Sequence, residues 1–176
     1  EIEIKLKVKD MNDLEDKLKR QGCVLSEPIE QHDVIYSNVN DTHSFTESYE
    51  GCIILRIRKE NGASIVNLKQ QRSGEMDNME YETEIKDPES MHNILLALGW
   101  KPEVEVKKVR KKGKLMEYEI CLDRVEKLGD FVELEKMTDD NANPEEVRDE
   151  LFKALEPYGL SIKDEETKGY DTQIYQ

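Results

Sequence analysis

The N-terminal stretch Glu1-Ile2-Glu3-Ile4-Lys5-Leu6-Lys7 alternates charged and apolar residues without interruption. This period of two is typical of a β-strand with one polar and one apolar face. The same alternation recurs in Leu55-Arg56-Ile57-Arg58, in Glu80-Tyr81-Glu82-Thr83-Glu84-Ile85 and in Val132-Glu133-Leu134-Glu135. These strands place too many charges on single faces for all of them to cover solvent-exposed sheet in a chain of 176 residues. We therefore expect the charged faces to line a polar interior.

The composition indicates a folded, polar protein. Although 38% of the residues are charged and 36% are hydrophobic, the apolar residues are periodic, which argues against a disordered chain. The length suits one domain spanning residues 1–176. The sequence has no apolar run long enough for a membrane helix and lacks the basic-then-apolar start of a signal peptide. Because Cys23, Cys52 and Cys121 are widely spaced and odd in number, we interpret them as buried thiols of a cytoplasmic protein.

The distribution of charge restricts the class of ligand. A net charge of −14 argues against nucleic-acid binding, which needs a basic surface to neutralise phosphates. The basic residues are nevertheless concentrated in three segments that we expect to be strands, around residues 5–9, 56–59 and 107–112. An acidic protein with cations gathered on strand faces suits a small polyanion bound inside.

Cap and turn residues divide the chain into helices and strands. Asn12, with Glu15 three residues later, predicts the start of a first helix. Asp87-Pro88 and Asn143-Pro144 predict two further helix starts, each with a cap residue followed by proline at the first helical position. The predicted strands are residues 1–8, 23–36, 51–59, 63–71, 79–86, 103–112, 115–122 and 130–136.

The connections indicate mostly antiparallel pairing. Glu60-Asn61-Gly62 predicts a tight hairpin, and Gly113 predicts a turn between two later strands. Residues 37–50 lack an apolar period and are expected to form a loop, and residues 73–78 are expected to connect two strands. Eight strands and three main helices predict an α+β fold with a closed or nearly closed antiparallel eight-stranded β-barrel and helices packed outside it.

A barrel of this size is wide enough to hold one small ligand. An interior filled only with charged side chains would be costly, because each unneutralised buried ion costs several kcal/mol. An anionic ligand together with a divalent cation removes that cost, since arginine and lysine bind phosphoryl oxygens and paired carboxylates bind Mg²⁺ or Mn²⁺. The side chains expected to point inward are Glu1, Glu3, Lys5, Lys7, Arg56, Arg58, Lys69, Glu80, Glu82, Glu84, Lys108, Arg110, Asp123, Glu133 and Glu135.

These residues follow one another in an order that resembles the CYTH superfamily, the triphosphate tunnel metalloenzymes. The opening motif, Glu1-x-Glu3-x-Lys5, is a weak signal alone, but the ordered series covers essentially the whole chain. The further matching motifs are Gln31-x-Asp33-x-x-Tyr36, Leu55-Arg56-Ile57-Arg58, Leu68-Lys69, Glu80-x-Glu82-x-Glu84, Lys108-x-Arg110 and the run from Gly129 to Glu135.

The resemblance implies roles for individual residues. The implied metal ligands are Glu1, Glu3, Glu133 and Glu135, with Asp123 as a further ligand for Mg²⁺ or Mn²⁺. The implied catalytic groups that grip the phosphates are Lys5, Arg56, Arg58, Lys69, Lys108 and Arg110. The expected substrate-binding set contains these cations together with Lys7, Glu80 and Glu82.

The resemblance also implies an enzyme that acts on a small triphosphate-bearing substrate. The motifs are most similar to the class IV adenylyl cyclase type, which converts ATP to cyclic AMP and pyrophosphate. Two alternatives stay open: a triphosphatase acting on inorganic triphosphate, nucleoside triphosphate or thiamine triphosphate, and a non-catalytic nucleotide or polyphosphate binding module. The expected partners include neither nucleic acid nor membrane, and a homodimer is suggested by the resemblance alone.

Overall fold

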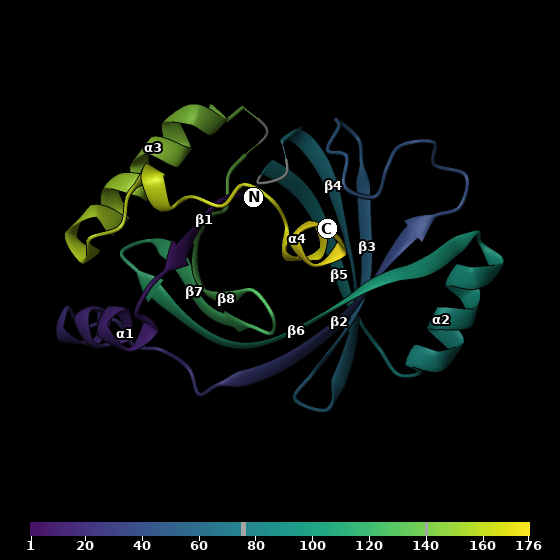
Figure 1. Ribbon diagram of the computed structural model, residues 1–176, viewed down its shortest axis with the longest axis horizontal. Helices are drawn as coiled ribbons and strands as arrows, with labels where there is room; N and C mark the ends of the chain where they lie inside the picture. The colour runs from purple at the N-terminus through teal and green to yellow at the C-terminus, as the bar shows by residue number, and fades with distance from the viewer. Residues whose placement is uncertain (75–76, 140) are drawn as a thin grey trace. The chain divides into compact units, whose positions relative to one another are not determined.

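The computed structural model of the chain contains eight strands that close into an antiparallel barrel, in the order β1-β5-β4-β3-β2-β6-β7-β8. Figure 1 labels these strands and the α-helices. The structure describes residues 1–74, 77–139 and 141–176, without the side chains of residues 73 and 74. The strands are β1 (Ile2–Val8), β2 (Ile29–Asn38), β3 (Ile53–Glu60), β4 (Ala63–Gly74), β5 (Asp77–Ile85), β6 (Trp100–Leu115), β7 (Tyr118–Val125) and β8 (Gly129–Lys136). The predicted α+β barrel is thereby confirmed.

The helices lie between and after the strands in sequence. They are α1 (Met11–Arg20), α2 (Pro88–Ala97), α3 (Pro144–Leu155) and α4 (Tyr170–Tyr175), with short 3₁₀ helices η1 (Glu156–Tyr158) and η2 (Ile162–Asp164). The chain forms two compact units, one of residues 1–29 and 109–167 and the other of residues 30–108 and 168–176. The assignment of residues 1–176 to a single domain stays a prediction.

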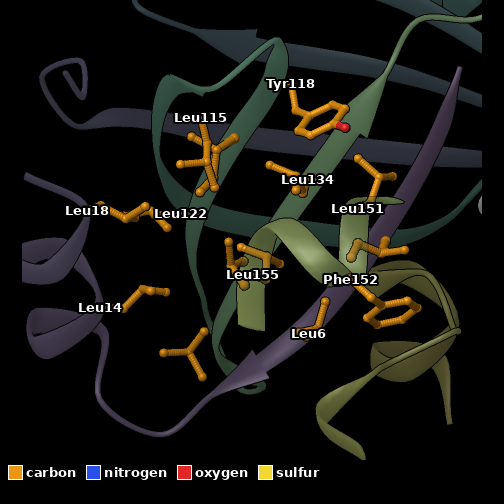
Figure 2. Packing of buried hydrophobic residues seen from close by; sticks show 14 of the residues in the cluster. Leu6, Leu14, Leu18, Leu115, Tyr118, Leu122, Leu134, Leu151, Phe152 and Leu155 are labelled. Carbon is orange, nitrogen blue, oxygen red and sulfur yellow. The ribbon is translucent and has the colours of Figure 1, made fainter. Parts of the chain in front are cut away.

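The first unit has its apolar core between a three-stranded sheet and two helices. Strand β8 pairs with both β1 and β7, which places Leu134 opposite Ile4 on one side and opposite Ile120 on the other. Figure 2 shows leucine side chains of α1, α3 and these strands packed together. The fully buried members of this core include Ile4, Leu6, Leu18, Ile120, Val132, Leu134, Leu151 and Leu155.

Strand β1 is buried on both of its faces from Ile2 to Leu6. Ile4 and Leu6 belong to the apolar core, yet Glu3 and Lys5 between them are only 8% and 2% exposed. Because successive side chains of a strand point to opposite sides, the charged face of β1 is also shielded from solvent. This burial excludes a solvated sheet face as the explanation of the opening sequence pattern.

The second unit contains the sheet β2–β3–β4–β5 and α2. Residues Leu55 and Ile57 of β3 form a small core with Tyr36 of β2 and Leu95 of α2. The predicted hairpin between β3 and β4 is confirmed, and both of its turn residues have positive φ, +48° at Asn61 and +81° at Gly62. The predicted connection at residues 73–78 is wrong where it is described, because residues 73–74 belong to β4 and residues 77–78 to β5; residues 75–76 lie outside the described residues.

Two of the three predicted helix starts are confirmed. The side chain of Asp87 accepts hydrogen bonds from the backbone N–H groups of Glu89 and Ser90 at the start of α2. At the start of α3, the side chain of Asn143 accepts one from the backbone N–H of Glu145. Each cap satisfies backbone donors that have no partner within the helix.

The predicted start of the first helix is wrong by two residues. Helix α1 is capped by Asp10, whose Oδ1 accepts a hydrogen bond from the backbone N–H of Asp13. Both Asp10 and Asn12 are good cap residues, but starting at Met11 brings Met11, Leu14 and Leu18 into the core. Tertiary burial therefore decides between two equivalent capping signals.

The expected turn at Gly113 is also wrong. Strand β6 continues through Gly113 to Leu115, and the turn comes at Met116, whose φ is +58°. Gly113 forms an isolated antiparallel bridge with Leu25, and a Cβ atom at this position would lie 2.7 Å from the carbonyl oxygen of Val24. Glycine is therefore required here for close backbone approach.

Replacing Gly113 by alanine should consequently destabilise the protein. We expect the Gly113→Ala variant to lose about 1–3 kcal/mol of unfolding free energy, because the new methyl group must displace a neighbouring backbone segment. Chemical denaturation followed by circular dichroism measures this loss. The neighbouring exposed substitution Lys114→Ala is the control and should change stability by less than about 0.5 kcal/mol. Equal stability of the two variants would contradict the close approach.

Candidate metal and triphosphate site

Three carboxylates of the first unit form a cluster suited to a divalent cation. Glu1 and Glu3 come from the start of β1, and Glu135 comes from β8, directly opposite Glu3 in the antiparallel register. One carboxylate oxygen from each of the three lies within 4.8 Å of the other two. Oxygen ligands at this spacing suit Mg²⁺ or Mn²⁺, because such hard cations prefer carboxylates.

The electrostatics of Glu135 reflect this crowding. Burial, followed by the negative charges of Glu1 and Glu3, raises the pKa of Glu135 from 4.5 to about 8. Like-charged carboxylates near one another disfavour the ionised form, and a bound cation reverses that effect. The donor set therefore fits a divalent metal, which would replace a proton at this position.

The other two expected metal ligands contact an arginine. Asp123 of β7 accepts two hydrogen bonds from Arg110, at 2.6 Å from Nε and 2.5 Å from Nη2, and Glu133 accepts another from Nη2. All three side chains are buried, and the pKa of Arg110 stays well above its usual value because the two carboxylates outweigh the effect of burial. Arg110 is thus held by carboxylates of the same unit.

The two lysines of β1 have different surroundings. Lys5 is only 2% exposed, and it lies opposite Glu133 in the β1–β8 register. Lys7 is exposed near the end of β1, and its Nζ lies 5.8 Å from the centre of the Phe131 ring. Lys5 therefore belongs to the buried charged face, whereas Lys7 lies near its margin.

In the second unit, a buried aspartate organises two of the predicted arginines. Asp33 of β2 accepts two hydrogen bonds from Arg58, both at 2.7 Å, and Nη1 of Arg56 lies 3.6 Å from its carboxylate. Burial by itself would raise the pKa of Asp33, but the hydrogen bonds from Arg58 and the charge of Arg56 hold it well below its usual value. Asp33 therefore stays ionised and fixes Arg58.

A second carboxylate lies among the remaining cations of this unit. Glu80 of β5 is 3.3 Å from Nζ of Lys69 and 3.7 Å from Nη2 of Arg56. The side chain of Asn67, only 1% exposed, donates to Glu80 and, at 3.4 Å, to Glu82. The structure thus brings together four predicted site residues, Arg56, Lys69, Glu80 and Glu82, around an asparagine.

Lys108 is covered by the C-terminal helix. Its side chain is buried, and Nζ lies 4.9 Å from the centre of the Tyr170 ring at the start of α4. A cation over an aromatic face is attracted by the electron density of the ring. Residue Tyr170 therefore contacts a predicted phosphate-binding group directly.

Three residues of the site were not predicted from the sequence: Asp33, Asn67 and Tyr170. Asp33 lies in the matched motif Gln31-x-Asp33, and Asn67 lies two residues before Lys69 and therefore on the same face of its strand, so the sequence contained evidence for both. The sequence contained none that distinguishes Tyr170 from an ordinary packed tail, because its contact with Lys108 joins residues 62 positions apart.

Comparison with known proteins identifies the family. Residues 1–170 match the CYTH domain family. The chain belongs to the CYTH domain family. Members of this family are adenylyl cyclase-like or triphosphatase enzymes that act on small triphosphate substrates and depend on a divalent metal.

Several relatives are similar over nearly the whole chain. A Methanocaldococcus jannaschii protein named "Putative adenylate cyclase" is 32% identical over 163 residues, which cover 92% of this chain and 90% of the relative. A solved structure from Pyrococcus horikoshii is 30% identical, covers 99% of both chains and has a TM-score of 0.81. An adenylyl cyclase-like Hippeastrum protein, named for a dominant triphosphatase activity, shares the fold at 18% identity, with a TM-score of 0.65 and coverage of 99% of this chain and 93% of its own.

Among the described residues, no helix combines the length and the apolar character needed to cross a membrane.

Neutralising Asp33 should destabilise the protein because Arg58 would remain buried without its bidentate partner. We expect Asp33→Asn to cost about 3–5 kcal/mol of unfolding free energy. Urea denaturation measures this loss, with Glu50→Gln, an exposed carboxylate in the same unit, as the control. A loss of unfolding free energy below about 1 kcal/mol would show that the Asp33–Arg58 pair does not stabilise the fold.

The raised pKa of Glu135 predicts a pH-dependent stability in the absence of metal. Native Glu135 keeps its proton up to about pH 8, whereas the unfolded chain releases it near pH 4.5. The native state therefore binds more protons between these values, and its stability should fall as pH rises from 5 to 9, by an amount on the order of 2 kcal/mol. Denaturation at several pH values in metal-free buffer tests this. Glu135→Gln should flatten the profile, and an unchanged slope would refute the assignment.

Proposed function

We propose that this CYTH protein is a metal-dependent enzyme acting on a triphosphate-bearing substrate, of the class IV adenylyl cyclase type. The observation that carries the proposal is the cluster of Glu1, Glu3 and Glu135. A protein that only binds polyanions gains nothing from three adjacent carboxylates, because they repel the ligand. The same groups would hold a divalent cation, and that cation would supply the positive charge that attracts phosphate oxygens.

The proposed metal ligands are Glu1, Glu3 and Glu135. When bound there, Mg²⁺ or Mn²⁺ would supply positive charge that stabilises the phosphate oxygens as negative charge develops during the reaction. The role of the protein is to hold the three carboxylates at a fixed spacing on two paired strands, β1 and β8. Asp123 and Glu133 support this region indirectly, by orienting Arg110.

The proposed phosphate-binding groups are cations of the matched sequence motifs. Arg56 and Lys69 contact Glu80 at 3.7 and 3.3 Å, and Arg56 also lies 3.6 Å from Asp33. We assign Arg56 and Lys69, with Lys5 and Lys108, to the phosphates. Arg58 and Arg110 act as rigid, preorganised donors whose orientation is set by carboxylates.

Two reactions use the same groups. In a cyclase, the 3′-hydroxyl of ATP attacks the α-phosphorus, the bond to the bridging oxygen breaks, and pyrophosphate leaves with the hydroxyl proton transferred to solvent or to the leaving group. In a triphosphatase, water attacks the terminal phosphorus, the bond to the bridging oxygen breaks, and orthophosphate and the diphosphate part of the substrate are released, with a proton of the water transferred to solvent or to the leaving group. The name of the Methanocaldococcus jannaschii relative favours the cyclase, and the name of the Hippeastrum protein makes the triphosphatase the second candidate.

The experiment is a product assay with defined substrates. Purified protein is incubated with ATP, inorganic triphosphate or thiamine triphosphate, each with Mg²⁺ or Mn²⁺, and the products are separated by chromatography. We expect cyclic AMP and pyrophosphate from ATP. Glu3→Gln should lower the rate by at least about 100-fold, because it removes a metal ligand, whereas Glu126→Gln, an exposed carboxylate in the same unit, should not change it.

The other outcomes each select a different conclusion. Orthophosphate from inorganic triphosphate or from ATP, without cyclic AMP, would replace the cyclase by a triphosphatase. No product from any substrate, together with a melting temperature raised by ATP or polyphosphate, would indicate a binding module without catalysis. Activity that persists unchanged in Glu3→Gln would contradict the proposed metal site.

A further inference from the structure

The carboxylate of Glu80 occupies a position suited to a phosphate group. It lies 3.3 Å from the ammonium of Lys69 and 3.7 Å from the guanidinium of Arg56, and it also accepts a hydrogen bond from Asn67. A phosphate oxygen bound by the protein would be held by the same kinds of donor, namely lysine, arginine and amide N–H groups. All four residues belong to the second unit.

The ion pairs of Glu80 with Lys69 and Arg56 are longer than that between Asp33 and Arg58, so a phosphate group can replace Glu80 more easily than it can replace Asp33. The Asp33 side chain is 4% exposed and bonds Arg58 through two 2.7 Å hydrogen bonds, a geometry in which both oxygens and two guanidinium nitrogens are matched. The Glu80 side chain is 22% exposed, and its ion pairs are longer. Longer and more solvated ion pairs are weaker, because water screens them.

We propose that Glu80 is an internal substitute for a substrate phosphate. Its carboxylate forms ion pairs with Arg56 and Lys69 in the ligand-free protein, and these ion pairs break when a phosphate group binds to the two cations. This inference rests on the proposed function and adds a role to one residue of that site. Glu80 is then a positioning residue that competes with the substrate for the same two cations.

Asn67 supplies a reason why Glu80 can release the cations without leaving the site. The amide nitrogen of Asn67 donates to Glu80 and, at 3.4 Å, to Glu82, so one side chain links both carboxylates of β5. An amide NH₂ group has two donors, so Asn67 can hydrogen-bond a carboxylate of β5 with one of them while the other is used elsewhere. The Glu80 carboxylate therefore keeps an anchor after its ion pairs with Arg56 and Lys69 are broken.

The proposal predicts the sign of a binding change. If Glu80 competes with phosphate, neutralising it should strengthen the binding of a polyphosphate, since no ion pair has to be broken first. If Glu80 only holds Arg56 and Lys69 in the correct geometry, neutralising it should weaken binding, because the cations would lose their orientation. The two roles therefore lead to opposite results for one substitution.

The test uses isothermal titration calorimetry of the full chain with inorganic tripolyphosphate, in buffer freed of metal by a chelating resin. Metal-free conditions isolate the contribution of the cations from that of the carboxylate cluster. We expect Glu80→Gln to bind tripolyphosphate about tenfold more tightly than the unmodified protein. Its melting temperature without ligand should be lower, because Arg56 and Lys69 lose a counter-ion.

Glu50→Gln is the matched control. Glu50 is an exposed carboxylate of the same unit, and its substitution changes the net charge by the same amount. We expect less than a threefold change in affinity, so a larger gain in Glu80→Gln cannot come from net charge alone.

A second variant keeps the net charge constant. Glu80→Asp shortens the side chain and withdraws the carboxylate from Lys69 and Arg56, so it should bind tripolyphosphate a few-fold more tightly even if Glu80→Gln fails to fold. Equal or weaker binding by the Glu80 variants, with normal binding by the unmodified protein, would overturn the competitive role and leave the proposed function intact. If the unmodified protein and every variant fail to bind tripolyphosphate, and adding Mg²⁺ or Mn²⁺ does not restore binding, both proposals are wrong.

Discussion

Neutralisation of buried charge is the constraint on which the rest of this structure depends. Charged side chains from most of the strands are shielded from water, and an isolated buried ion would cost several kcal/mol. The protein meets this cost with bidentate pairs, Asp33 with Arg58 and Asp123 with Arg110. Each pair joins two different strands, so the same contacts that neutralise the charges also fix the register of side chains around them.

The proposed function uses a different set of charges. The carboxylates of Glu1, Glu3 and Glu135 lie close together, and burial together with their mutual repulsion raises the pKa of Glu135. Arg56 and Lys69 share the partly exposed carboxylate of Glu80 through contacts of 3.7 and 3.3 Å. In the proposed function, a divalent cation would relieve the repulsion among the three carboxylates, and a phosphate group would replace Glu80 as the partner of the two cations.

Sequence patterns predicted the architecture well where they reflect local physics. Alternation in β1 and β8 gave both strands, and Asp87-Pro88 and Asn143-Pro144 gave the starts of α2 and α3. The errors came where a distant segment decides the local structure. Asp10, not Asn12, caps α1 because of core packing, and Gly113 continues a strand because the backbone at Val24 lies against it.

The amino-acid sequence by itself determined the strand periodicity, the alternation of charged and apolar residues and, through its ordered motifs, the family. The tertiary structure alone decided how those charges are paired. Nothing in the spacing separates Glu133 from Glu135, since both alternate on one strand, yet Glu133 contacts Arg110 and Glu135 lies in the carboxylate cluster with Glu1 and Glu3. The reason is physical: a side chain's ionisation and partner depend on the three-dimensional distances to other charges, which residues far apart in the sequence set.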